Sequence, residues 1–126
     1  MKIVIATHNN DKLNEILKAF KNELKDIEFL SLNDFPEIGE IEENGKTLEE
    51  NALIKAREVN SITGIPALSD DTGLEVDALH GEPGVFTARY AGEGCSYNDN
   101  VEKLLDEMQR VPMPNRTAKF RTVVAY

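Results

Sequence analysis

The sequence of 126 residues contains one cysteine, Cys95, no tryptophan and only 6% aromatic residues. A single cysteine excludes an internal disulfide and favours a reducing, cytosolic location. No apolar run approaches the ~20 residues that cross a bilayer, so we expect no membrane-spanning segment and no membrane partner. The first apolar segment, residues 2–6, is too short for a signal peptide and leads directly into polar residues.

Positive charge is also scarce. Fourteen basic residues stand against twenty-three acidic ones, and the formal net charge is -9. Such a field repels long polyanions, so we expect no binding to nucleic acid. A small anionic ligand stays compatible with this charge if a lysine, a helix N-terminus or a bound metal supplies a local cation. The length and the 40% hydrophobic content predict a single domain, residues 1–126.

Hydrophobic periodicity predicts strands that alternate with helices. The expected strands are 2–6, 27–32, 67–69, 74–79 and 118–126, and the expected helices are 10–25, 47–61 and 98–109. Thr47 and Glu50 form a capping-box pattern at the start of the second helix. The positions expected to face inward are Leu13, Ile16, Leu17, Phe20 and Leu24 in the first helix, Ala52, Ala56 and Val59 in the second, and Val101, Leu104, Leu105 and Met108 in the third. This order of elements is typical of an α/β fold.

A polar segment, residues 7–12, joins the first strand to the first helix. In α/β sheets, ligands bind where strands end and helix N-termini present backbone N–H groups to anions. Lys12, in the first helical turn, would add a full positive charge. The glycines of a Walker loop are absent. The alternatives are an ordinary capped helix start and, for His8, a hydrogen-bonded turn residue.

Acidic residues precede the second helix and follow the third strand. Glu43 lies in a loop bounded by glycines, where the helix dipole would stabilise it or where it would ligate a metal. Asp70 and Asp71 are adjacent, and two acids that both stay ionised normally need a nearby cation. Mg²⁺ prefers one or two carboxylates together with water and substrate phosphates. A type I turn is the alternative for the aspartates, and Lys55 would reach either a phosphate or solvent.

Together these segments resemble the non-canonical purine nucleoside triphosphate pyrophosphatases, the inosine/xanthosine triphosphatase or Ham1-like family. Four blocks in order carry the resemblance, which covers nearly all of the chain: Ile5–Lys12 with Glu15, Glu43–Thr47 with Glu50–Ala52 and Lys55–Ala56, Ser69–Leu74, and Gly81–Val85 with Ala88–Tyr90. His8 stands where the family usually has a glycine. The resemblance implies an elongated α/β fold, a mixed sheet flanked by helices, with a cleft between two lobes.

The resemblance also implies an activity and roles for residues. The activity is Mg²⁺-dependent hydrolysis of inosine, deoxyinosine and xanthosine triphosphates to monophosphate and pyrophosphate by a homodimer, which removes deaminated purines from the nucleotide pool. Asp71 would be the general base and a metal ligand, Glu43 the second metal carboxylate, and Asp70 a supporting one. The residues implied to bind the substrate are Thr7, His8, Asn9, Asn10, Asp11, Lys12, Thr72 and Lys55.

Chains of this family continue well beyond the position of Tyr126. Their later Phe-Gly-Tyr-Asp block, a lysine and a Ser-His-Arg block, which enclose and select the base, are absent from this sequence. We therefore expect a truncated version of the two-lobed fold with exposed apolar edges, and either self-association or a partner chain that covers this surface; a stable monomer in size-exclusion chromatography would contradict this. The alternatives are an impaired fragment that only binds nucleotide or self-associates, and a house-cleaning pyrophosphatase that acts on other nucleotides.

Overall fold

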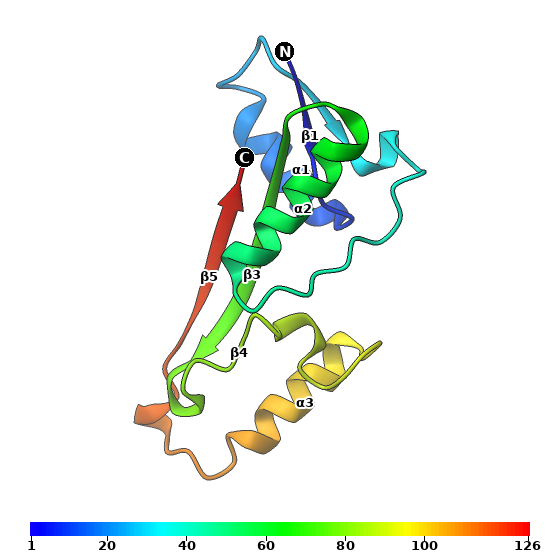
Figure 1. Cartoon of the computed structure of the whole chain (residues 1–126). Coiled ribbons are helices and arrows are strands. Elements are labelled where there is room, and N and C mark those ends of the chain that lie inside the picture. Colours follow the sequence, from blue (N-terminus) through cyan, green and yellow to red (C-terminus); the bar gives the residue numbers. More distant parts are fainter. The chain divides into compact units, whose positions relative to one another are not determined.

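The computed structural model describes all residues, 1–126, and the chain divides into two compact units (Figure 1). The first unit comprises residues 1–71 and 123–126, and the second comprises residues 72–122. The expectation of a single domain stays a prediction. No helix combines the length and the hydrophobicity of a membrane-spanning helix. The cytosolic location also stays a prediction.

The sheet of the first unit is built around β1 (Lys2–Ile5). This strand pairs in parallel with β2 (Glu28–Ser31) on one side and with the beginning of β3 (Ala67–Val76) on the other. Helix α1 (Asn10–Phe20) connects β1 to β2, and α2 (Leu48–Thr63) precedes β3. Parallel strands joined through helices are the arrangement expected of an α/β fold, so the predicted fold class is confirmed for this unit.

The core of the first unit is apolar and contiguous. It contains buried side chains from β1, from the segment after β2, from α2 and from β3: Val4, Ala6, Leu32, Ile38, Val59 and Ala67. The predicted inward face of α2 is confirmed, because Ala52, Ala56 and Val59 are all buried. This packing fixes α2 against the strands, and α2 carries Lys55.

Replacing Val59 by alanine should lower the free energy of unfolding by about 2 kcal/mol, since Val59 is fully buried and its methyl groups would leave a cavity. Chemical denaturation measures this change. Val101→Ala is a matched control in another helix, because Val101 is 43% exposed, and it should change the stability by less than about 0.5 kcal/mol. Equal effects of the two substitutions would contradict the assignment of Val59 to the core.

The ends of α2 follow the sequence signals with one difference. Thr47 caps the helix by accepting a hydrogen bond from Glu50 N at 3.1 Å. Gly64 ends it with φ 70°, a left-handed conformation that glycine adopts without strain. The Glu50 carboxylate accepts from Lys46 N at 2.6 Å instead of from Thr47 N, so the reciprocal half of the predicted capping box does not form.

Helix α1 is shorter than predicted. It ends at Phe20, with Lys21 as its C-cap, whereas the sequence pattern extends to Lys25. Leu13 is buried, but Leu24 is 38% exposed and lies in the turn that follows the helix. Hydrogen bonds from Glu23 and Leu24 to Phe20 O close this turn. The apolar spacing therefore continues for one turn beyond the helix itself.

Strand β3 is the largest departure from the predicted elements. The sequence favours two strands separated at Asp70–Gly73, but Figure 1 shows β3 as one unbroken strand, and it spans Ala67–Val76. The aspartates therefore lie inside a strand and not at its end or in a turn. Residues 77–79, predicted as strand, form a 3-10 turn instead.

The second unit contains the later part of β3, the short strand β4 (Pro83–Gly84), helix α3 (Tyr97–Glu107) and most of β5 (Ala118–Ala125). Strand β4 pairs with β3 in the antiparallel direction, and β5 also pairs with β3. Short 3-10 turns complete the structure at Leu32–Asp34, Asp77–Leu79, Thr87–Arg89 and Met113–Asn115. Parallel and antiparallel pairs together confirm the predicted mixed sheet.

The predicted inward face of α3 is only partly correct. Met108 is buried, whereas Val101 and Leu105 are 43% and 59% exposed. Lys103 of the same helix contacts Tyr90: its ammonium group donates to Tyr90 O at 2.8 Å and lies 4.3 Å from the centroid of the Tyr90 ring. A cation–π contact of this kind favours a lysine over an aliphatic residue against the ring.

Candidate active site

The polar corner between β1 and α1 is organised by its own side chains. Thr7 Oγ1 accepts a hydrogen bond from Asn9 N at 3.1 Å. Asn9 is the N-cap of α1, and its Oδ1 accepts from Asp11 N at 3.0 Å and from Lys12 N at 3.2 Å. Two of the backbone N–H groups expected to be free for a phosphate are therefore capped by Asn9, as in an ordinary helix start.

The other predicted substrate-binding residues of this corner are exposed. His8 Nε2 donates to Gly39 O at 3.1 Å and so links the corner to the acidic loop before α2. Asn10 Oδ1 accepts from Asn33 Nδ2 at 3.4 Å. Asp11 lies in the first turn of α1, with its side chain exposed. His8 is thus the hydrogen-bonded turn residue of the alternative interpretation.

Lys12 connects this corner to β3. Its ammonium group lies 2.8 Å from Asp70 Oδ2; the Lys12 side chain is 33% exposed and that of Asp70 is 9% exposed. The contact exists because β1 ends at Ile5, which pairs with Leu68, while β3 continues past that point. Although the aspartates lie inside β3, they come just after Leu68, the residue of β3 that pairs with the last residue of β1. They therefore lie at the carboxyl end of β1, where ligands bind in α/β sheets.

Lys55 joins three segments of the first unit. Its ammonium group lies 2.7 Å from Glu43 Oε1 and also donates a hydrogen bond to the backbone carbonyl of Asp70. Only 13% of the Lys55 side chain is exposed. Helix α2 supplies the lysine, the acidic loop supplies Glu43, and β3 supplies the carbonyl. The lysine whose position was undecided from spacing alone therefore faces the acidic residues and not solvent.

Asp71 has an unsatisfied oxygen. Its Oδ2 is buried and has no hydrogen-bond partner. Burial raises the pKa of the Asp71 carboxyl above its usual value, Lys55 opposes this rise, and Glu43 adds to it; the Asn51 side chain, by hydrogen bonding, and Lys12 oppose it further. A buried polar atom without a partner lowers the stability of the fold, so we expect a ligand to contact this oxygen.

The five charged groups of this cluster do not balance. If all are ionised, two ammonium groups, of Lys12 and Lys55, face three carboxylates, of Glu43, Asp70 and Asp71, which leaves one net negative charge. No group of three or more His, Cys, Asp or Glu side chains would hold a metal ion by itself. The unsatisfied Oδ2 of Asp71 beside the Glu43 charge fits a cation such as Mg²⁺, which completes its shell with water and phosphate oxygens.

Asn51 is part of this cluster, and sequence reasoning gave it no role beyond its place in a block of the family resemblance. It is only 1% exposed, and its Oδ1 accepts from Gly45 N at 2.7 Å. A signal was present in the sequence, because Asn51 lies four residues before Lys55 and therefore on the same face of α2. An amide at a buried helical position next to an acidic loop indicates a polar site.

Thr72 belongs to the second unit, unlike the other predicted site residues. Its Oγ1 lies 2.8 Å from Thr122 Oγ1, so the hydroxyl is engaged within that unit. The remaining site residues, Thr7–Lys12, Glu43, Lys55, Asp70 and Asp71, are all in the first unit.

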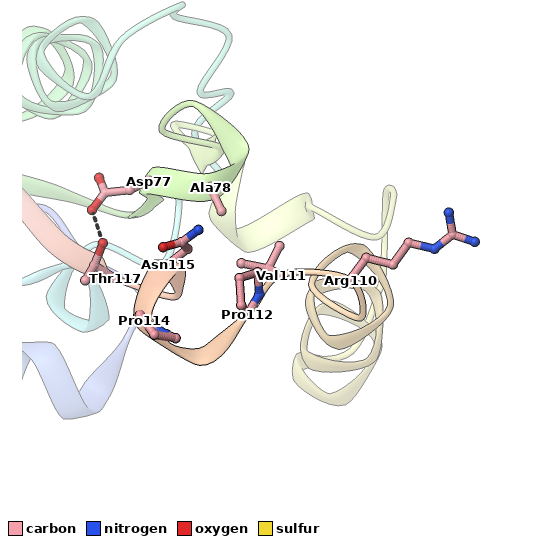
Figure 2. Close-up of a pocket in the computed structure, with 8 residues that line it drawn as sticks. All are labelled: Asp77, Ala78, Arg110, Val111, Pro112, Pro114, Asn115 and Thr117. Atoms are coloured by element: carbon pink, nitrogen blue, oxygen red, sulfur yellow. Dashed lines mark hydrogen bonds between the residues drawn. The ribbon is translucent and has the colours of Figure 1, made fainter.

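The second unit has an open pocket of about 450 Å³ between Asp77–Ala78 and the segment that connects α3 to β5 (Figure 2). Asp77 Oδ2 accepts from Thr117 Oγ1 at 2.6 Å, and the Arg110 side chain points away from the other labelled residues (Figure 2). None of the predicted site residues lines this pocket. The candidate active site is therefore the charged cluster of the first unit, and this cavity is not part of it.

Asp71→Asn should raise the melting temperature at neutral pH, by about 2 °C, because it removes a carboxylate whose folded-state pKa is raised by burial. Below pH 3.8, the usual pKa of an aspartate, Asp71 is protonated in both the folded and the unfolded state, and the variant should match the wild type. The difference in melting temperature between the variant and the wild type should grow as the pH rises from 3.8 through the raised pKa of Asp71, and should then stay constant. Thermal unfolding from about pH 3 to pH 8 tests this, with exposed Asp26→Asn as the control.

Comparison with known proteins identifies the family. The model of the Ham1 family matches residues 3–126. A dITP/XTP pyrophosphatase of Elusimicrobium minutum is 54% identical over 125 residues, which cover 98% of this chain and 64% of the relative. The corresponding protein of Geobacter sulfurreducens is 52% identical over 124 residues, covering 98% of this chain and 61% of the relative.

Solved structures agree with this result. A HAM1 protein from Coxiella burnetii superposes with a TM-score of 0.88 and 39% identity, over 99% of this chain and 62% of that one. The Staphylococcus aureus Ham1 protein gives a TM-score of 0.82 and 36% identity, with 98% and 62% covered. This chain thus spans less than two thirds of the length of these relatives. The sequence and its fold both place the chain in the Ham1 family.

Proposed function

We propose that the protein is a nucleoside triphosphate pyrophosphohydrolase that converts purine nucleotides such as dITP and XTP to monophosphate and pyrophosphate. The observation that carries this proposal is the buried, unpartnered Oδ2 of Asp71 among two lysines and two further carboxylates. Two relatives with more than half of their aligned residues identical to this chain are named dITP/XTP pyrophosphatases, which supports the same substrate class.

Lys12 and Lys55 are the groups suited to bind the triphosphate. Lys12 is held by the Asp70 carboxylate and Lys55 by the Glu43 carboxylate, and 33% and 13% of the two lysine side chains are exposed. Charges held in place before the substrate arrives stabilise developing negative charge without reorganisation in the transition state. Asp70 serves this function indirectly, since its ion pair fixes the Lys12 ammonium group over the cluster.

Glu43 and Asp71 are the residues that would hold Mg²⁺, with Asp70 nearby in the same cluster. When bound, the ion would neutralise phosphate oxygens and lower the pKa of a coordinated water. The Asp71 carboxylate, with its raised pKa, is suited to accept a proton from water as a general base. Lys55 opposes this rise of the pKa by its positive charge.

The experiment that tests the function is a product assay with the 126-residue chain. Incubation with dITP and Mg²⁺ should release pyrophosphate and deoxyinosine monophosphate in equal amounts, and EDTA should stop the reaction. Release of inorganic phosphate with dIDP would contradict cleavage between the α and β phosphates. Binding of dITP with no product would favour the impaired fragment.

We also propose that the chain associates with a second copy. Large apolar side chains of β5 and its end are exposed, with Phe120 and Tyr126 each 70% exposed and Val124 60% exposed. Apolar side chains on a strand that are left in water favour association. The self-association expected from the sequence therefore stays a proposal, and its measurement is the chromatography described above.

A further inference from the structure

Asn51 is a buried polar side chain in a position where an apolar residue would ordinarily pack. It is 1% exposed and neighbours fully buried Ala52 on α2. A buried amide has to satisfy one carbonyl oxygen and two N–H donors, and an unsatisfied group would destabilise the fold. The partners of Asn51 therefore indicate why an amide is present.

One partner fixes the orientation of the amide. Asn51 Oδ1 accepts from Gly45 N at 2.7 Å. A backbone N–H group only donates, so the oxygen of Asn51 must face the loop, and its NH₂ group is turned to the other side. On that side the Asn51 side chain hydrogen-bonds to the Asp71 carboxyl group. A single amide thus joins the loop that carries Glu43 to the strand that carries Asp71.

Gly45 is shaped for this contact. The residue is buried, and a Cβ atom at this position would stand 2.6 Å from Asn51 Oδ1 and 2.7 Å from Glu50 Cβ. Both distances are below any ordinary contact, so only glycine lets the loop backbone approach the amide this closely. The next residue is held as well, because Lys46 N donates to the Glu50 carboxylate at 2.6 Å.

We propose that Asn51 is a positioning residue that holds the Glu43 loop and Asp71 at the separation needed for both carboxylates to ligate one divalent cation. Glu43 lies two residues before the tethered Gly45. Its ion pair with Lys55 acts on the carboxylate at the end of the Glu43 side chain, whereas the hydrogen bond from Gly45 N to Asn51 Oδ1 acts on the loop backbone. This inference rests on the proposed function, because it assumes that the two carboxylates share a cation.

The experiment measures Mn²⁺ binding by the full 126-residue chain, with electron paramagnetic resonance to count free Mn²⁺. Asn51→Ala and Gly45→Ala should each raise the dissociation constant by about tenfold or more, as losses of groups that orient metal ligands do. Gly39→Ala is the matched control in the same loop, because a Cβ there meets nothing within 4 Å, and its affinity should equal that of the wild type. Circular dichroism identifies the variants that are folded at the temperature of the titration.

The outcomes separate the two proposals. If folded Asn51→Ala binds Mn²⁺ as tightly as the wild type, Asn51 has no positioning role, while the proposed function stands. If that variant does not fold, Gly45→Ala decides: weaker binding supports the inference and equal binding overturns it. If the wild type itself does not bind Mn²⁺, the shared cation site is refuted, and the positioning role is refuted with it.

Discussion

Asp71→Asn is expected to slow pyrophosphate release from dITP by about a thousandfold, which corresponds to ~4 kcal/mol of transition-state free energy. An amide is nearly the same size as the carboxylate, but it accepts no proton at neutral pH and binds a cation weakly. The carboxylate oxygen that loses its charge is the one that is buried without a hydrogen-bond partner. Steady-state turnover with saturating Mg²⁺ measures the effect.

The stability of the same variant separates chemistry from folding. Because burial raises the pKa of Asp71, the substitution should leave the fold intact and slightly more stable at neutral pH. A variant that loses activity and gains stability marks a group kept for function at a cost in stability. Unchanged turnover in Asp71→Asn would remove Asp71 from the active site, and an equal loss in the control Asp26→Asn would point to a nonspecific cause.

Lys12→Met is expected to lower kcat/KM for dITP by about a hundredfold, or ~2.7 kcal/mol. Lys12 brings a positive charge to the carboxyl end of β1, and its ammonium group is held 2.8 Å from Asp70 Oδ2. Methionine keeps most of the aliphatic length and removes the charge. The loss should appear in the initial rates at low substrate concentration.

Lys2→Met provides the comparison for Lys12. Lys2 lies at the start of β1, the strand that precedes Lys12. Its side chain is 58% exposed and forms a 3.6 Å ion pair with Glu28. An exposed pair of this kind contributes little to stability, and Lys2 has no contact with the acidic cluster. The kcat/KM of Lys2→Met for dITP should equal that of the wild type. If the two substitutions had equal effects, general electrostatic attraction would explain the role of Lys12, and a specific phosphate contact would be wrong.

Most of the first unit could be predicted from the sequence, because local signals and packing agree there. The apolar segment 2–6, the Thr47 cap, the small residues of α2 and Gly64 each favour the element that forms. The end of α1 was predicted less well, since Leu24 continues the helical spacing but is 38% exposed in the turn after the helix. Spacing alone does not distinguish a helical turn from the open turn that follows it.

The continuity of β3 could not be predicted from local residues. Asp-Asp-Thr-Gly suits a turn, and the sequence contains no alternation that favours a strand. In the structure the pairings are non-local: residues 67–68 pair with β1, and residues 74–75 pair with β4. Because both ends of β3 are paired with other strands, the backbone of residues 69–73 between them is extended. This conformation places the aspartates beyond the end of β1.

The charged members of the candidate site were recognisable, but their partners were not. Acidic and basic residue types indicated Glu43, Asp70, Asp71 and Lys12 from the sequence. The close pairing of Lys55 with Glu43 depends on how α2 packs on the sheet, which spacing does not report. Asn51 was given no role of its own, because its helical spacing to Lys55 does not show that it is buried and bonded to the loop just before α2.

The most direct test is the location of a divalent ion in crystals grown with Mn²⁺ and a non-hydrolysable dITP analogue. Anomalous scattering should show an Mn²⁺ peak ligated by Glu43 and Asp71, with analogue phosphate oxygens completing its shell and the Lys12 ammonium group on the same phosphates. An Mn²⁺ site that contacts neither carboxylate, with the phosphates bound away from Lys12, would contradict the proposed active site.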